Sequence, residues 1–284
     1  MESETLCASI LLQLCELIVN DDIGDWSGLA GGTKFLIRSR GVHRYNSPFD
    51  LAMLESQMSF VLGQSLKSKE PCFLCAPEWQ ALVLQIPAWP FQNLQSKTLS
   101  LRSRLGAILV ESPSLIMQFS AINAKYPDQT DWEEQSGILM QKALILLGQV
   151  KRYHALEAEP LLLSYASPQK VVQERIEYPD VISGVLDCVA NTALLTIDNI
   201  LRSLCDLRLR SFGLDEKSRE LQLKTSQLLD DPEIVEQWRQ RAIVAFNFVH
   251  GESVIAAKPL AFGLRHAQCG DFPNSAKEML DQNK

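Results

Sequence analysis

The longest regular pattern in this 284-residue chain is a run of apolar side chains that directly follows Pro179 and recurs every three or four residues. That spacing places the side chains on one face of a helix. The run consists of Ile182, Val185, Leu186, Val189, Ala193, Ile197, Ile200, Leu204 and Leu207. It predicts a helix of about 28 residues, which we expect to be the central core helix of the fold.

Helical periodicity also dominates elsewhere in the chain. One predicted helix has a single buried stripe made of Leu6, Ile10, Leu14, Leu17 and Ile18, and similar patterns cover residues 51–62 and 138–150. A further helix is predicted after Asp231 and Pro232, which are suited to its cap and its first turn. Strand signals are few. The sequence therefore predicts an all-α fold, a single irregular helical domain over residues 1–269 followed by a polar tail over residues 270–284.

Composition and charge narrow the possible partners and locations. A hydrophobic content of 46% excludes disorder for most of the chain. The formal net charge of −7 argues against autonomous nucleic-acid binding, which normally needs a basic face. The seven scattered cysteines are typical of reduced thiols, and neither a secretory signal nor a membrane span is expected. We predict a nuclear or cytoplasmic protein whose partner is a protein or a small apolar effector, with no membrane contact.

Several short motifs follow one another in the first third of the chain, and each has an architectural reason. Gly41 is suited to ending a helix, and Ser47 with Pro48 to starting the next one. Trp79 and Trp89, which lie close to prolines, are suited to fixing loops against helices. In order, the motifs are Trp26, Leu29, Gly31, Phe35-Leu36-Ile37 and Arg40-Gly41; Ser47-Pro48-Phe49, Ala52, Leu54 and Glu55; then Pro71, Phe73-Leu74, Pro77-Glu78-Trp79, Pro87 and Trp89.

This ordered set of motifs resembles the fungal-specific transcription factor domain, the regulatory region that follows a six-cysteine zinc cluster in many fungal activators. Tyr178-Pro179-Asp180 and Lys258-Pro259-Leu260 fit the same pattern, so the resemblance covers about four fifths of the chain. It implies a helical domain that regulates transcription, with a nuclear location and a role in secondary metabolism.

Two departures from that family shape the functional hypothesis. The zinc cluster needs six closely spaced cysteines, whereas this sequence has one C-x2-C pair, Cys72 and Cys75. The residues between them are apolar, which favours packed thiols over metal ligands, and no metal or cofactor is expected. Moreover, residues 6–16 resemble a helix from the middle of the family domain. We therefore expect a regulatory protein without a DNA-binding domain of its own.

The candidates for chemistry are few. Arg40, His43, Arg44 and Tyr45 gather between two predicted helices, where they could bind an anion or orient a substrate oxygen. The alternative is that they are solvated charges at a helix end. His43, Arg40 and Tyr45 are the candidate catalytic residues, and Trp26 and Trp89 are candidates for lining an apolar pocket. The sequence lacks a nucleophile elbow, a phosphate-binding glycine loop and a dinucleotide fingerprint.

Two functions stay open at this point. The first is a free-standing regulatory or effector-binding protein of the transcription-factor type that does not bind DNA itself. The second is a repurposed helical enzyme that cyclises or isomerises an apolar fungal secondary metabolite without a bound cofactor, a reaction in which shape and a few hydrogen bonds suffice. The sequence does not indicate the oligomeric state.

Overall fold

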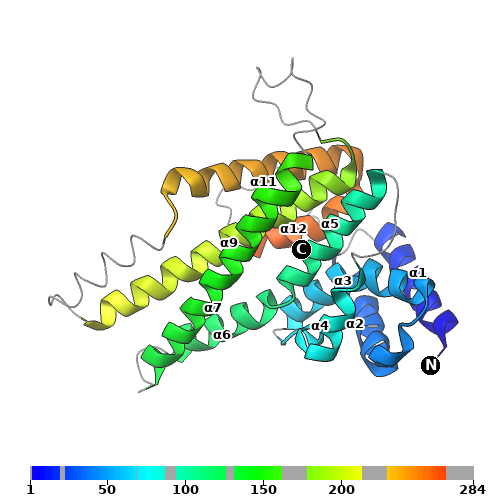
Figure 1. The fold of residues 1–284 in the computed structure, drawn as a ribbon, viewed down its shortest axis with the longest axis horizontal. Helices are drawn as coiled ribbons and strands as arrows, with labels where there is room; N and C mark the ends of the chain where they lie inside the picture. Colours follow the sequence, from blue (N-terminus) through cyan, green and yellow to red (C-terminus); the bar gives the residue numbers. More distant parts are fainter. Residues whose placement is uncertain are drawn as a thin grey trace, which may run out of the picture.

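The all-α prediction is confirmed. The computed structural model describes residues 2–19, 23–68, 70–86, 94–125, 131–161, 178–212 and 229–266, and within them every regular element is a helix (Figure 1). The predicted tail over residues 270–284 and Trp89 lie outside the described residues.

The first half of the chain forms short and medium helices. These are α1 (Ser3–Val19), α2 (Ile23–Arg40), α3 (Pro48–Ser68), α4 (Pro77–Val83), α5 (Leu94–Leu109) and α6 (Ser112–Lys125), with 3-10 turns at Val42–Arg44 and Phe73–Cys75. The helices of the second half vary in length from 13 to 32 residues. These are α7 (Trp132–Tyr153), which continues as a π-helical turn over His154–Ala158, then α9 (Val181–Phe212), α11 (Pro232–Glu252) and α12 (Val254–His266).

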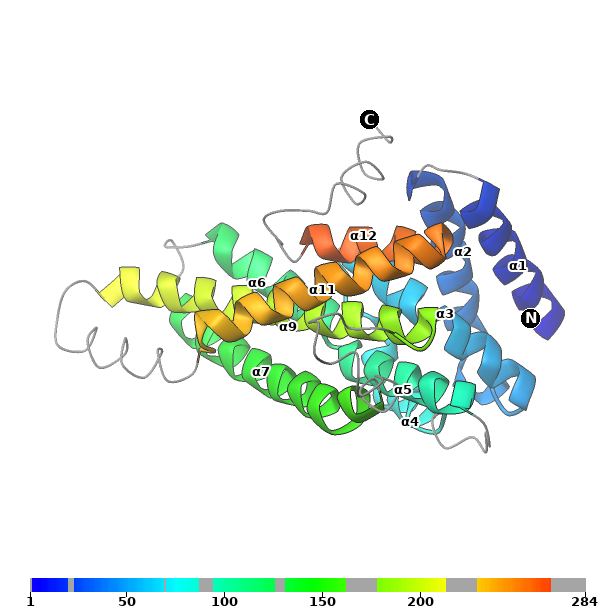
Figure 2. The same ribbon diagram turned by 90° about the horizontal axis from the view of Figure 1, so that it is seen from above.

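The predicted central helix is α9, which is 32 residues long. It packs between α7 and α11 along most of its length, and α12 also contacts it (Figures 1 and 2). Its stretch Val181–Arg210 is long and apolar enough to span a membrane, as is Lys97–Ala124. For α9, 67% of the most apolar window is buried inside the fold, as expected of a core helix.

The helix ends follow the predicted capping chemistry. Asp231 accepts a hydrogen bond from the backbone nitrogen of Glu233 at 2.9 Å, at the start of α11. Ser47 accepts one from the backbone nitrogen of Asp50 at 3.2 Å, at the start of α3. Gly41, directly after α2, has φ = +75°, a conformation that favours glycine. These three predictions are confirmed.

Helices α1 to α4 form a separate hydrophobic cluster at one end of the molecule (Figure 1). Trp79 is buried there, with its ring edge-on to Tyr45 and Phe73 at centroid distances of 5.7 and 4.8 Å. Cys72 is buried in the same cluster, and the Cys75 thiol donates to the carbonyl oxygen of Val110 at 2.8 Å. The prediction of a tryptophan plug is confirmed for Trp79 and that of a packed thiol for Cys72, whereas Cys75 is partly buried.

The predicted buried stripe of α1 is partly wrong. Leu6, Ile10 and Leu17 are buried, but Leu14 is 37% exposed and Ile18 is 59% exposed. The fully buried Gln13 completes the packed face instead. Apolar residues occupy most positions around this helix, so periodicity alone does not determine which face packs. The neighbouring helix determines which face packs. The hydroxyl groups of Ser9 of α1 and Thr33 of α2 form a hydrogen bond at 2.8 Å, which turns that side of α1 towards α2.

Gly184 of α9 lies in tight contact with α11. A Cβ atom there would lie 2.8 Å from Cδ1 of Phe248 and 2.9 Å from Cγ2 of Val249, whereas Gly148 of α7 has open space around it. We expect Gly184→Ala to lower the free energy of unfolding by about 1 kcal/mol through overpacking. Gly148→Ala should raise it by about 0.5–1 kcal/mol through helix propensity. Urea denaturation of both variants checks the opposite signs, and a stabilised Gly184→Ala would contradict the described packing.

Candidate functional site

Arg40 lies at the centre of a buried ion-pair cluster that joins α1, α2 and α3. Its Nη2 donates to Oδ1 of Asp50 at 2.6 Å and to Oγ of Ser3 at 2.7 Å. The guanidinium carbon lies 5.1 Å from the ring centroid of Tyr45. Only 4% of the Arg40 side chain is exposed, so the alternative of solvated helix-end charges is wrong for Arg40, whereas it fits His43 and Arg44, which are both exposed.

The structure brings Arg40 and Tyr45 together but leaves His43 outside the cluster. His43 is exposed on the 3-10 turn and makes none of these hydrogen bonds. Burial raises the pKa of the Tyr45 phenol, so it stays protonated. Burial also disfavours the charged form of Asp50, but hydrogen bonds from Ser47, Ser3 and Arg40 outweigh it and lower the carboxyl pKa. This arrangement fits a structural ion pair better than a catalytic site.

The predicted pocket residues do not help to define a ligand site. The backbone of Trp26 lies in α2, but its side chain is outside the described part of the structure, as is the whole of Trp89. An open hollow at the start of α7 is mostly polar. Its lining residues are Asp131, Glu133, Glu134, Gly137, Ile138, Gln141 and Arg208. It lies at the opposite end of the molecule from α2 (Figure 1), so it is not the apolar pocket that the sequence predicted.

A second buried polar cluster, which the sequence analysis missed, surrounds Asp187 of α9. The Asp187 carboxylate is 0% exposed and has four side-chain hydrogen-bond partners. Its Oδ2 accepts from the Tyr178 hydroxyl at 2.7 Å and from Nε of Arg241 at 2.8 Å. Its Oδ1 lies 3.0 Å from Nε2 of His154 and accepts from Nδ2 of Asn191 at 3.1 Å. One carboxylate thus links the end of α7, α9 and α11.

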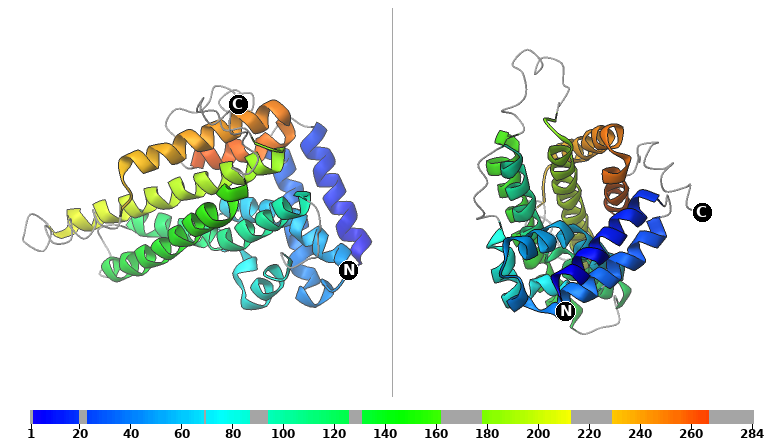
Figure 3. Two further views of the ribbon diagram at one scale, coloured as in Figure 1. Left: turned by 45° about the horizontal axis from the view of Figure 1, so that its top comes forward. Right: turned by 90° about the vertical axis from the view of Figure 1, so that its right-hand side faces the viewer.

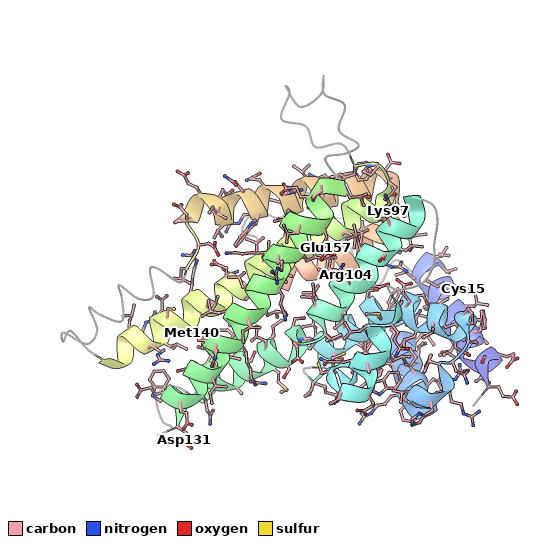
Figure 4. The ribbon with its side chains drawn as sticks, in the orientation of Figure 1. Cys15, Lys97, Arg104, Asp131, Met140 and Glu157 are labelled. Atoms are coloured by element: carbon pink, nitrogen blue, oxygen red, sulfur yellow. The ribbon has the colours of Figure 1, made fainter. Side chains whose placement is uncertain are left out.

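Charge and local geometry both single out this cluster. Burial disfavours ionisation of Asp187, but the His154 hydrogen bond and the Arg241 charge outweigh it and lower the carboxyl pKa. His154 opens a π-helical turn, a feature often found at functional sites. Glu157 of the same turn pairs with Arg104 of α5 at 2.8 Å (Figure 4).

The chemistry that the His154–Asp187 pair can support is proton transfer. A carboxylate that holds one imidazole nitrogen leaves the other available to accept or donate a proton. The His154 side chain is 12% exposed, so solvent reaches a small part of it. A sequence signal for the pair existed, since Asp187, Asn191 and Asp198 share one face of a helix that was expected to be central, and all three are 0% exposed.

The lowered pKa of Asp187 predicts a pH dependence of stability. A carboxyl whose pKa is depressed by folding stabilises the fold at pH values above its ordinary pKa of about 3.9, and this contribution is lost as the pH falls through the folded value. We therefore expect stability to fall on acidification below about pH 4, and to fall less steeply in Asp187→Asn. Urea midpoints measured between about pH 7 and 3 check this. Parallel profiles for the two proteins would contradict the role given to Asp187.

The outer side of α1 is the most apolar exposed helix face among the described residues. Leu11, Leu12, Ile18 and Val19 are 56%, 61%, 59% and 76% exposed, and Cys15 is exposed between them. Figures 2 and 3 show α1 at the edge of the molecule, with α2 on one side only, and Figure 4 places Cys15 on this helix. An exposed apolar patch of this kind typically marks an interaction site.

Comparison with known proteins gives no relative of this chain. No family model, no curated protein and no solved structure matches it. The resemblance to the fungal transcription factor domain therefore stays a prediction.

Proposed function

We propose that this chain is a regulatory protein of the transcription-factor type that acts by binding a protein partner and does not contact DNA itself. The observation that carries the proposal is the outer face of α1, where four large apolar side chains are more than half exposed. Exposing these side chains to water is unfavourable by about 25 cal/mol per Å² of apolar area. A partner surface that covers them would recover this free energy. The net charge of −7 supports the proposed absence of DNA contact, because DNA affinity comes mainly from basic side chains that contact phosphate groups.

A gene-deletion experiment tests this function. Deleting the gene in its source organism should change a defined set of transcripts, and re-expressing the chain should restore them. The purified chain should give no salt-sensitive shift of duplex DNA in a mobility assay at physiological salt. An unchanged transcript profile, or tight DNA binding by the chain alone, would contradict the proposal.

The second candidate is the enzyme that rearranges an apolar metabolite without a cofactor, and the His154–Asp187 pair favours it. Proton transfer by a positioned imidazole contributes typically about 10²–10⁴-fold to rate. The purified chain would be incubated with metabolite extract from the deletion strain and followed by mass spectrometry. Conversion of an accumulating compound by the wild type, with loss of that conversion in a folded His154→Gln variant, would establish this candidate in place of the first.

A further inference from the structure

The acidic charge of the chain is concentrated at the end that carries the exposed apolar face. The first 25 residues contain six acidic side chains and no lysine, arginine or histidine. The other 259 residues contain 28 acidic side chains against 27 lysine and arginine side chains, so they are close to neutral. Almost all of the net charge of −7 therefore belongs to α1 and the residues next to it. The six acids are Glu2, Glu4, Glu16, Asp21, Asp22 and Asp25.

The exposed apolar side chains of α1 lie on one side of the helix, and acidic residues stand near both ends of this stretch in the sequence. At 100° per residue, positions 8, 11, 12, 15, 18 and 19 share one side of the helix and are uncharged, and Glu4 continues the same side at its N-terminal end. Glu2 and Glu4, both exposed, lie at the N-terminal end of α1, and Asp21 and Asp22 follow its C-terminal end in the sequence. A helix of 17 residues is about 25 Å long, enough to fill a groove on another protein.

The packed side of α1 holds the helix in place, so this surface is preformed. Ser9 bonds to Thr33 of α2, and Ser3 donates to Oδ1 of Asp50 at 2.8 Å. At the other end, the buried Lys258 of α12 donates from Nζ to the carbonyl oxygen of Leu17 at 3.1 Å. A cation at this position satisfies a terminal carbonyl and complements the helix dipole. A partner that binds α1 therefore does not have to order it first.

We propose that the outer face of α1 docks into an apolar groove of a partner protein whose rim carries lysine and arginine side chains. This inference rests on the proposed function and adds the chemistry of the partner. Complementary charge at the rim steers association and excludes unsuitable surfaces. The acidic charge of the first 25 residues also disfavours two other occupants of this face, a second copy of the chain and an anionic lipid surface. A second copy of the chain would bring the six acids of its own first 25 residues near the first six, and an anionic lipid surface attracts helices rich in lysine and arginine.

A photo-crosslinking experiment identifies the occupant. The photoreactive residue p-benzoylphenylalanine replaces Leu12 in the full chain, expressed in the source organism, and replaces Ile145 of α7 in the control, since the two are similarly exposed, at 61% and 56%. We expect an adduct with another protein from position 12 and not from position 145, with the crosslinked peptide in an apolar groove flanked by basic residues. An adduct with a second copy of the chain, equal adducts from both positions, or no adduct from position 12 would overturn the inference.

Binding measurements with the purified partner then separate the two contributions. We expect Leu11→Ser/Ile18→Ser to weaken binding by at least about 10-fold and Glu2→Gln/Glu4→Gln by about 3-fold at low salt, with the second difference vanishing at about 1 M salt. The matched controls Ile138→Ser/Ile145→Ser and Glu133→Gln/Glu134→Gln, all on exposed positions of α7, should bind as the wild type does. A groove without basic residues, or glutamine variants that bind normally, would overturn the inference. The regulatory proposal would survive that result, since its own test is the transcript profile.

Discussion

Replacing Asp187 with alanine is expected to lower the free energy of unfolding by about 3–5 kcal/mol. The substitution removes a fully buried carboxylate that accepts from Tyr178 and Arg241 and lies against His154. Arg241 then keeps only its ion pair with Glu159, at 2.9 Å, among the ion pairs of this cluster. Its half-buried guanidinium loses a hydrogen-bond partner, which lowers the stability of the fold. Urea denaturation measures the loss.

The matched control for this substitution is Asp206→Ala on the same helix. Asp206 is exposed on α9, and a surface substitution of this kind changes stability by no more than about 0.5 kcal/mol. Equal effects of Asp187→Ala and Asp206→Ala would show that the Asp187 cluster does not join the three helices as described.

The second large effect concerns the cluster that the sequence put forward as catalytic. Arg40→Ala should cost about 3–5 kcal/mol, because it leaves the buried Asp50 carboxylate without its cation. His43→Ala should change stability by less than about 0.5 kcal/mol, since His43 is exposed and outside the hydrogen-bonded cluster. The two residues are three positions apart, yet their effects should differ several-fold.

Thermal or urea unfolding of the two variants, with Arg38→Ala as control, checks this contrast. Arg38 is exposed on the same last turn of α2. A large loss of stability in His43→Ala, or none in Arg40→Ala, would contradict the structural role of this ion pair.

The sequence predicted the features that depend on local pattern. The periodic run after Pro179 located α9, and capping chemistry located the starts of α3 and α11 at Pro48 and Pro232. Such features depend on residues three or four positions apart, which a single sequence displays directly.

The features that depend on distant residues were not predictable in the same way. The partners of Arg40 include Ser3, which is 37 positions away, and Asp187 meets Arg241 across 54 positions. Nothing in the local pattern of α1 showed that Leu14 and Ile18 would face outwards, because helices α2 and α3 decide which side is covered. The candidate site therefore changed from the His43 region to the Asp187 cluster and the outer face of α1.

The most direct test of the regulatory account is a rescue experiment in the deletion strain. Wild-type chain and the Ile138→Ser/Ile145→Ser control should both restore the transcripts, whereas Leu11→Ser/Ile18→Ser should fail at equal protein level. The control changes two exposed apolar residues at the same seven-residue spacing on α7, so it matches the loss of surface hydrophobicity. Full rescue by Leu11→Ser/Ile18→Ser would contradict the claim that this protein works through the outer face of α1.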